Sequence, residues 1–208
     1  MSNKAIGAEN QQATCESRES SETICQTPFT KSEIIAYLNG ALHDASLNKG
    51  KRFRFVQKYK KWLEKIQELL KEIGCRCWIY KEGKNRELYV AETLCKDLDF
   101  RFEAEKLRTN REKMMYLRGF FDAEGGIPRI AGRFYIQLTQ KDYKKIAIIK
   151  KLLLDIGIKS GKIHNPSKKI DPNYWRIFVL VKHHNLFASI INSWHPIKSK
   201  IFSERMKI

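Results

Sequence analysis

Apolar residues recur every three or four positions in two stretches of the chain, residues 57–74 and 140–157. This spacing places them along one face of an amphipathic helix, and each stretch ends in a glycine that suits a helix C-terminus. The two stretches also align without a gap and match at eight of their 18 positions. We interpret them as two copies of one helical unit; two unrelated helices rich in Lys, Leu and Ile are the alternative.

Short stretches in which apolar and polar residues alternate flank both helices, and such alternation is typical of half-buried strands. The pattern predicts strands at residues 52–55, 75–80, 87–93, 133–139, 159–164 and 174–181. Each half then has the order helix, strand, strand, helix, strand, strand, with a final helix clear only in the second half. One face of each small sheet packs on helices, and the other carries polar and basic side chains.

A second repeat precedes each of these units: residues 37–46 align with residues 116–125 and share Tyr, Leu and Gly at the same places. A glycine inside a helix costs about 1 kcal/mol relative to alanine. Its presence at Gly40 and again at Gly119 therefore indicates that two helix backbones come into close contact there. We expect both glycines at a helix–helix interface.

The duplication also divides the chain into parts. Residues 1–29 are rich in Ser, Thr, Glu and Gln with few large apolar side chains, so ordering them would bury little surface, and we expect a flexible tail. Thr30, with Glu33 three residues later, forms a capping box that should begin the first helix. We expect an N-terminal half at residues 30–110 and a C-terminal half at residues 111–208.

The charge of the chain favours a polyanionic partner. The 208 residues hold 40 Lys and Arg against 23 Asp and Glu, a net charge of +17, and residues 30–208 carry about +19 because the first 29 residues are slightly acidic. Such an excess releases counterions when it meets phosphates, although solubility alone is the alternative explanation. The side chains that we expect to face such a partner are Arg52, Arg54, Arg133, Tyr135, Gln137 and Arg176. An ordinary solvated sheet face is the alternative for them.

Membrane and disulfide-rich classes are not favoured. No run of 18 apolar residues occurs, so we expect no membrane span. The five cysteines are odd in number and two lie in the expected tail, which suits a reducing compartment better than a disulfide framework. We therefore expect an intracellular protein, either cytoplasmic or organellar in a eukaryotic host.

Residues 117–125, LRGFFDAEG, resemble the LAGLIDADG motif, and the duplicated chain resembles the single-chain, two-motif LAGLIDADG homing endonucleases over roughly residues 31–206. The second half continues in family order through residues 139–142, 155–157 and 194–200. The resemblance implies an α+β, pseudo-twofold duplicated αββαββ(α) fold with two saddle-shaped antiparallel sheets. In that family the two motif helices pack at the pseudo-twofold axis, and the sheets lie in the major groove of double-stranded DNA.

The resemblance also implies roles for individual residues. Glu124 occupies the acid position and would serve catalysis and bind Mg²⁺ or Mn²⁺. Gln140 and Gln57 match a glutamine near the catalytic water, with capping of a strand-to-helix junction as the alternative. Lys200 matches a basic residue beside the scissile phosphate. The chemistry is reasonable in itself, because hard cations that act on phosphates take oxygen ligands.

The first motif departs from the family pattern. Ala45 stands at the position that Glu124 occupies in the second motif, and Asp44 lies one residue early. One residue turns a side chain by about 100° on a helix, so Asp44 joins the metal site only if the helix end unwinds. The pattern indicates that the first half is eroded. In that case Ala45→Asp should increase double-strand cleavage.

Two functions follow from the resemblance. The first is a monomeric, metal-dependent, site-specific DNA endonuclease of the homing type, encoded with an intron or intein, which cuts slowly or nicks one strand because of Ala45. The second is a nucleic-acid-binding derivative that does not cleave, either an RNA maturase that assists splicing or a DNA-binding protein. Basic sheet faces would serve both functions.

Overall fold

A computed structural model describes residues 28–129 and 132–206 of the chain. The expected tail, apart from Pro28 and Phe29, lies outside the described residues. The elements of the N-terminal half are α1 (Lys31–Ala41), the 3₁₀ turn η1 (Leu42–Asp44), β1 (Ala45–Asn48), β2 (Arg52–Gln57), α2 (Lys60–Glu72), β3 (Cys77–Lys81) and β4 (Tyr89–Thr93). A connection containing the 3₁₀ turn η2 (Ala104–Lys106) leads to the second half.

The C-terminal half repeats this order with shorter strands. Its elements are α3 (Asn110–Glu124), β5 (Gly125–Gly126), β6 (Gln137–Gln140), α4 (Tyr143–Asp155), β7 (Trp175–Phe178), η3 (Val181–His183), α5 (His184–Leu186), the π-helical turn η4 (Phe187–Ile191) and α6 (Pro196–Met206). The sheets are antiparallel, with strand orders β1-β2-β4-β3 and β5-β6-β7. The α+β class and the two antiparallel sheets are thus confirmed.

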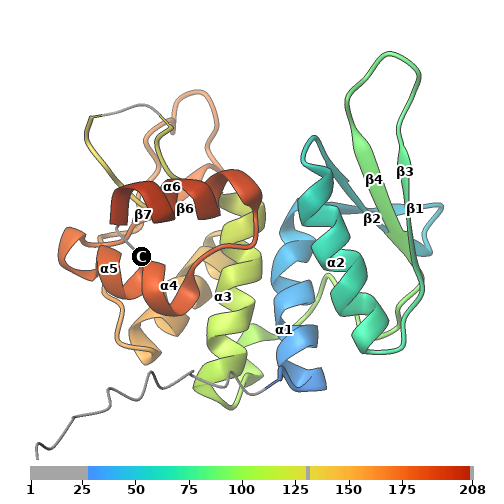
Figure 1. The fold of residues 1–208 in the computed structure, drawn as a ribbon. Helices are drawn as coiled ribbons and strands as arrows, with labels where there is room; N and C mark the ends of the chain where they lie inside the picture. The colour runs from blue at the N-terminus through green and yellow to red at the C-terminus, as the bar shows by residue number, and fades with distance from the viewer. Residues whose placement is uncertain (1–27, 130–131, 207–208) are drawn as a thin grey trace, which may run out of the picture.

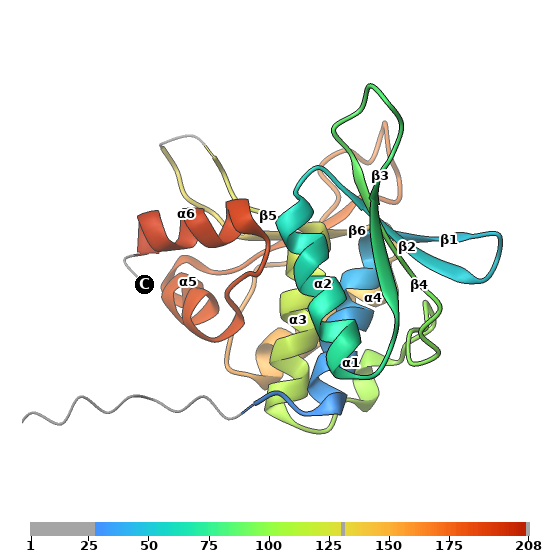
Figure 2. The same ribbon diagram turned by 45° about the vertical axis from the view of Figure 1, so that its right-hand side comes forward.

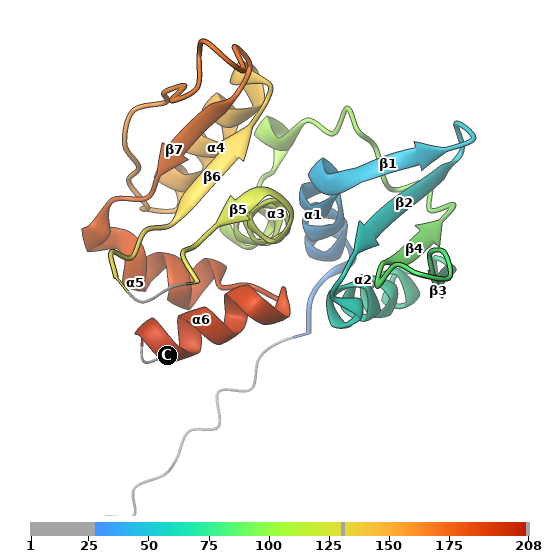
Figure 3. The same cartoon turned by 90° about the horizontal axis from the view of Figure 1, so that it is seen from above.

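The two halves meet along α1 and α3, which lie side by side in the middle of the molecule (Figure 1). Seen from above, β1 continues from α1 and β5 from α3, and the two sheets extend to opposite sides (Figure 3). Helix α2 packs on the first sheet and α4 on the second. The loop between β3 and β4 reaches beyond the ends of the helices (Figure 2).

Helices α1 and α3 begin in the same way. Thr30 and Thr109 each accept a hydrogen bond from the backbone N–H three residues later, and the glutamates at those positions, Glu33 and Glu112, bond back to the cap backbone. These capping boxes satisfy N–H groups that a helix start otherwise leaves unpaired. The helix start expected at Thr30 is confirmed.

Glycine allows α1 and α3 to come into close contact. A Cβ atom on Gly40 would lie 2.9 Å from the backbone N of Phe120, and one on Gly119 would lie 2.9 Å from the backbone N of Ala41. Backbone atoms cannot move aside as a flexible side chain can. The structure therefore places both glycines at the crossing, where only a hydrogen atom fits.

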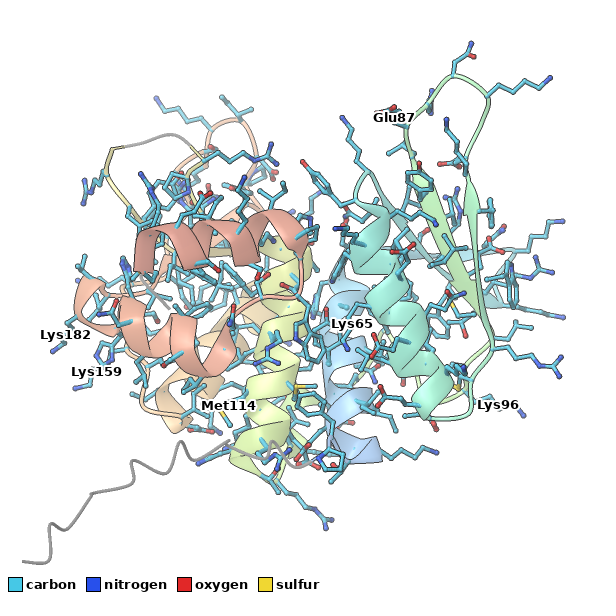
Figure 4. The ribbon with its side chains drawn as sticks, in the orientation of Figure 1. Lys65, Glu87, Lys96, Met114, Lys159 and Lys182 are labelled. Carbon is cyan, nitrogen blue, oxygen red and sulfur yellow. A yellow bond between two sulfur atoms is a disulfide. The ribbon has the colours of Figure 1, made fainter. Side chains whose placement is uncertain are left out.

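Trp194 contacts residues of both halves beside this crossing. Its ring lies 4.5 Å from the ring of Tyr37 on α1 and 5.6 Å from that of Phe29. The ammonium of Lys65 on α2 lies 4.9 Å from the same ring, and the guanidinium of Arg118 on α3 lies 4.7 Å from it. Figure 4 shows Lys65 between α2 and the C-terminal half. Phe29, which we assigned to the tail, therefore takes part in the contact between halves.

Two expectations about the strands and cysteines are corrected. Residues 159–164 form isolated bridges, Ser160 with Val179 and His164 with Arg176, in place of a continuous strand. The pairing is interrupted because the intervening backbone bonds irregularly, for example from the N–H of Gly161 to the carbonyl of Phe178. Cys75 and Cys95 form a disulfide with Cα atoms 5.4 Å apart, where we expected reduced thiols. No helix among the described residues is long and apolar enough to cross a bilayer.

Candidate active site

The pairing of the strands determines which residue of the first motif corresponds to Glu124. Ala45 pairs with Phe55, two residues before Gln57. Gly125 pairs with Leu138, two residues before Gln140. Relative to its sheet, Ala45 thus corresponds to Gly125, and the residue before it, Asp44, corresponds to Glu124. Both acids stand at the point where a motif helix passes into the first strand of its sheet.

Asp44 follows Gly40 by four residues, whereas Glu124 follows Gly119 by five. The end of the first motif helix compensates in part for the missing residue. Residues 42–44 form a 3₁₀ turn, η1, where α3 stays α-helical to Glu124. A 3₁₀ helix has three residues per turn in place of 3.6, so each residue turns a side chain by about 20° more. Three residues recover about 60° of the roughly 100° that the missing residue would supply. We expected Asp44 to join the site only if the helix end unwinds, whereas the structure shows a tighter turn that rotates Asp44 part of the way toward the direction of Glu124.

The electrostatics of the two acids indicate that they are close together. The pKa of Glu124 is raised to about 7, chiefly by burial and then by the negative charge of Asp44, while Lys198 and Lys141 oppose the shift. Burial also raises the pKa of Asp44, against a hydrogen bond from Gln57 and the charge of Lys198. The charge of Asp44 disfavours the ionisation of Glu124, and a cation placed beside both acids would favour it.

The lysine beside the acids is Lys198, and the expectation for Lys200 is corrected. Lys198 Nζ donates to the carbonyls of Phe121 at 2.6 Å and Asp122 at 2.8 Å, at the end of α3. Burial lowers its pKa to about 8, although three carboxylates, including those of Asp44 and Glu124, oppose the shift. Lys200 has a side chain 71% exposed and pairs with Glu204 at 3.7 Å.

The geometry of α6 explains the error, because residues two apart on a helix face directions about 200° apart. The two-residue spacing indicates that only one of Lys198 and Lys200 can face the motif helices. Which of the two does so depends on where α6 begins.

The two glutamines differ in their contacts. Gln57, the last residue of β2, donates its amide to the carboxylate of Asp44. Gln140, the last residue of β6, donates to His43 Nδ1 at 2.9 Å and accepts from the backbone N–H of Lys141 at 2.7 Å. The structure therefore brings Gln57 to an acid and Gln140 to a histidine.

Two hydrogen-bonded pairs cross the helix interface at equivalent positions, and our sequence analysis missed both. Tyr37 Oη donates to Asp122 at 2.8 Å, and the equivalent Tyr116 Oη lies 3.0 Å from His43 Nε2. Because His43 Nδ1 accepts from Gln140, its Nε2 carries the hydrogen and donates to Tyr116. The signal was available, since both tyrosines align in the repeat.

Asp122 is fully buried, and its carboxylate organises the segment that leads to Lys198. It accepts from Tyr37, from the hydroxyl of Ser193 and from the backbone N–H of Trp194 at 3.1 Å. Burial raises its pKa, while these hydrogen bonds and the charge of Lys198 lower it. Asp122 therefore fixes the approach of α6 to the motif helices.

A cavity of about 270 Å³ adjoins the acids. Gln57, Lys198, Arg129 and His195 contribute polar side chains to its lining. Of these four side chains, Lys198 and Arg129 are cationic, and Gln57 donates a hydrogen bond to Asp44. The cavity therefore combines positive charge with access to a carboxylate, which suits a phosphate group.

The residues that we expected to face DNA lie on both sheets. Arg52 and Arg54 lie on the face of β2 opposite the buried Phe55. Gln137 and Arg176 are on β6 and β7, and their side chains are 3.5 Å apart. Tyr135 packs edge-on against Phe178 at 5.6 Å, and Arg133 is exposed ahead of β6.

The comparisons with known proteins bear on the family and the fold of the chain. A family model described as a LAGLIDADG-like domain matches residues 111–192, which contain the motif helix and its acid. The chain is similar to the LAGLIDADG homing endonucleases, and the family model covers its second half. Homing endonuclease I-ApeI of Aeropyrum pernix is 26% identical over 194 residues, which cover 82% of this chain and 86% of that protein.

Solved structures share the LAGLIDADG fold at lower identity. A crystal structure of I-DmoI in complex with DNA and Mn matches with a TM-score of 0.60 and 20% identity, covering 78% of this chain and 98% of that chain. Full-length DUF199/WhiA from Thermatoga maritima matches with a TM-score of 0.63 and 19% identity, covering 86% of this chain and 63% of that chain. The first half, outside the range of the family model, is thus included in the structural match.

Proposed function

We propose that the protein is a metal-dependent, site-specific DNA endonuclease of the homing type. The observation that carries the proposal is the pairing of Asp44 and Glu124 at equivalent ends of the two motif helices. The relatives support it: one is named a homing endonuclease, and another crystallised with DNA and Mn. One chain supplies both halves, so we infer that it acts as a monomer.

The donor set fits a divalent cation. Asp44 and Glu124 end equivalent motif helices, and the pKa of Glu124 is raised to about 7 by burial and by the charge of Asp44. Mg²⁺ and Mn²⁺ prefer such oxygen ligands. Asp44 and Glu124 would hold the ion, and when bound it would polarise a phosphoryl oxygen and lower the pKa of a bound water.

The surrounding side chains have supporting roles in this proposal. Lys198 presents a positive charge beside both acids and would bind a phosphate oxygen in the adjoining cavity, where Arg129 adds a second positive charge. Gln57 orients the Asp44 carboxylate through its hydrogen bond. Gln140 bonds to His43 in place of an acid, so we assign it a less direct role.

A nucleic-acid-binding protein that does not cleave, acting on DNA or as a maturase on RNA, is the second candidate. This candidate is favoured by the different hydrogen bonds of the two glutamines: Gln57 bonds to Asp44, whereas Gln140 bonds to His43. The two strands of a bound duplex would therefore meet different side chains, and the site would be less suited to cutting both strands. The similarity to WhiA is consistent with either function, since the comparison bears on the fold alone.

A cleavage assay separates the two candidates. Duplexes that the protein binds are first selected from a random pool without divalent metal, and Mg²⁺ or Mn²⁺ is then added. We expect cleavage by the wild type, none by Glu124→Gln, and normal cleavage by Glu72→Gln, which removes the same charge from an exposed position on α2. Tight binding with no cut in either strand at any metal concentration would contradict the enzyme.

A further inference from the structure

A buried carboxylate lies on the open face of the N-terminal sheet, away from the candidate active site. Glu92 on β4 is only 2% exposed. Its neighbours across the sheet are Arg54 on β2 and Trp78 on β3, so all three side chains share one face. Phe55 and Ala91, one residue along on β2 and β4, are buried on the opposite side against the helices.

Four polar side chains converge on this carboxylate. Asn48 donates to Glu92 Oε1 at 2.7 Å, and Tyr80 donates to the same oxygen at 3.1 Å. Arg52 donates to Oε2 at 3.4 Å, and Arg54 Nε lies 3.9 Å from Oε1. Burial alone would raise the pKa of Glu92, but these hydrogen bonds and the charge of Arg52 outweigh it and lower the pKa. The carboxylate is therefore ionised and fully bonded.

The contacts leave the two arginines reachable but hold them in place. Their side chains are 48% and 22% exposed, and Arg54 also pairs with Glu82. The guanidinium of Arg52 lies 5.7 Å from the ring of Trp78. Two positive and two negative charges make the cluster neutral. A neutral cluster attracts phosphates only weakly. The two guanidinium groups, held in fixed positions, are instead suited to donating hydrogen bonds to base edges.

The C-terminal sheet differs in this respect. The guanidinium of Arg176 lies 3.5 Å from Gln137 and 4.9 Å from the ring of Phe178. Among the described residues Arg176 forms no ion pair, and Arg133, ahead of β6, is exposed. Positive charge on this sheet is not offset, so it is available to phosphates.

We propose that Glu92 is a specificity-determining positioning residue. It fixes Asn48, Arg52, Arg54 and Tyr80 so that the N-terminal sheet discriminates between base sequences, while the C-terminal sheet contributes more to general affinity. The proposal rests on the proposed function, because it requires DNA to lie along the open faces of the sheets.

Selection from a random duplex pool tests this inference. The pool is randomised over about 20 base pairs, two helical turns, and selection is done without divalent metal so that no duplex is cut. We expect the wild type to select a site with two blocks of preferred bases, one for each sheet. Glu92→Gln should reduce preference in one block by about tenfold or more per position and leave the other block intact. Affinity for the unselected pool should stay equal or rise.

Glu87→Gln is the matched control. Glu87 is exposed in the loop of the β3–β4 hairpin, near its tip in Figure 4, so the change removes the same charge from the same sheet without touching the cluster. It should select the wild-type site. If Glu92→Gln does not fold, Tyr80→Phe removes one hydrogen bond to Glu92 at an exposed position and should weaken the same block.

The outcomes separate the inference from the proposed function. A wild type that selects a site, with the same preferences in Glu92→Gln and Tyr80→Phe, overturns the inference alone. An equal loss in both blocks also overturns it, because that pattern reports a general structural defect. A wild type that selects no duplex sequence overturns the proposed function and the inference with it.

Discussion

At the scale of single residues, Glu124 is the group from which we expect the main dependence on pH. Its pKa is raised to about 7 by burial and by Asp44, whereas the unfolded chain would titrate near its ordinary value of 4.5. Between these values the folded state holds a proton that the unfolded state has released. Stability from this group is therefore present at low pH and is lost as the pH rises toward 7, by an amount on the order of 2 kcal/mol.

A divalent cation should reverse this loss. We expect Mg²⁺ to raise the melting temperature more at about pH 8, where Glu124 is ionised, than at about pH 5.5, where it is protonated. Thermal unfolding with and without Mg²⁺ at both pH values measures the effect. Glu124→Gln should show neither the pH-dependent loss nor the extra gain. Equal gains at both pH values would argue against cation binding by this acid.

Ala45→Asp separates the structural account from the idea of an eroded motif. Erosion predicts a gain in cleavage, but Asp44 already holds the position that corresponds to Glu124. Ala45 is partly buried against the core, so an acid there should cost about 2 kcal/mol of stability. We expect no gain in cleavage and a lower midpoint in urea. Faster double-strand cleavage would restore the erosion account.

Lys198 and Lys200 form a matched pair for mutation, since they lie two residues apart on α6. Lys198→Met removes the charge beside both acids and should lower the cleavage rate by about 100-fold or more. Lys200→Met removes an exposed charge and should leave the rate near that of the wild type. Single-turnover rates on the selected duplex test both. A larger effect at Lys200 would contradict the assignment.

At the scale of elements, most of the structure could be predicted from the pattern of the chain. The helices expected at 57–74 and 140–157 are confirmed as α2 and α4, which each begin three residues later and end two residues earlier. An amphipathic period over many residues is a strong local signal. The strand expected at 159–164 was wrong, because strand formation depends on pairing with distant residues. The equivalence of Asp44 and Glu124 was missed for the same reason, because it depends on the register between paired strands.

The crossing of α1 and α3 is the element contact that should tolerate change least. Gly119→Ala would place a methyl group against the backbone of α1, and we expect a loss of about 3 kcal/mol or more. Gly161→Ala is the control, because its nearest neighbour would be the Phe178 carbonyl at an ordinary 3.7 Å. Urea unfolding measures both. A loss below about 1 kcal/mol at Gly119 would mean that the helices can separate at little cost.

At the scale of the whole molecule, the duplicated chain combines a nearly symmetric frame with unequal surroundings for its two acids. Asp44 accepts a hydrogen bond from Gln57, while Glu124 belongs to the half whose glutamine bonds His43. Lys198 comes from α6, which has no counterpart after β4 in the described part of the first half. The net charge of +17 supports binding to nucleic acid, and the paired acids are the feature on which the proposed nuclease activity rests.

Cleavage of both strands of a selected duplex by Asp44→Asn tests the central claim most directly. With Mg²⁺, we expect the wild type to cut both strands and Asp44→Asn to lose at least about 100-fold in rate, comparable to Glu124→Gln. Binding of the uncut duplex should be retained in both variants. If Asp44→Asn cuts both strands at the wild-type rate while Glu124→Gln does not, the two acids do not form one site and the account is contradicted.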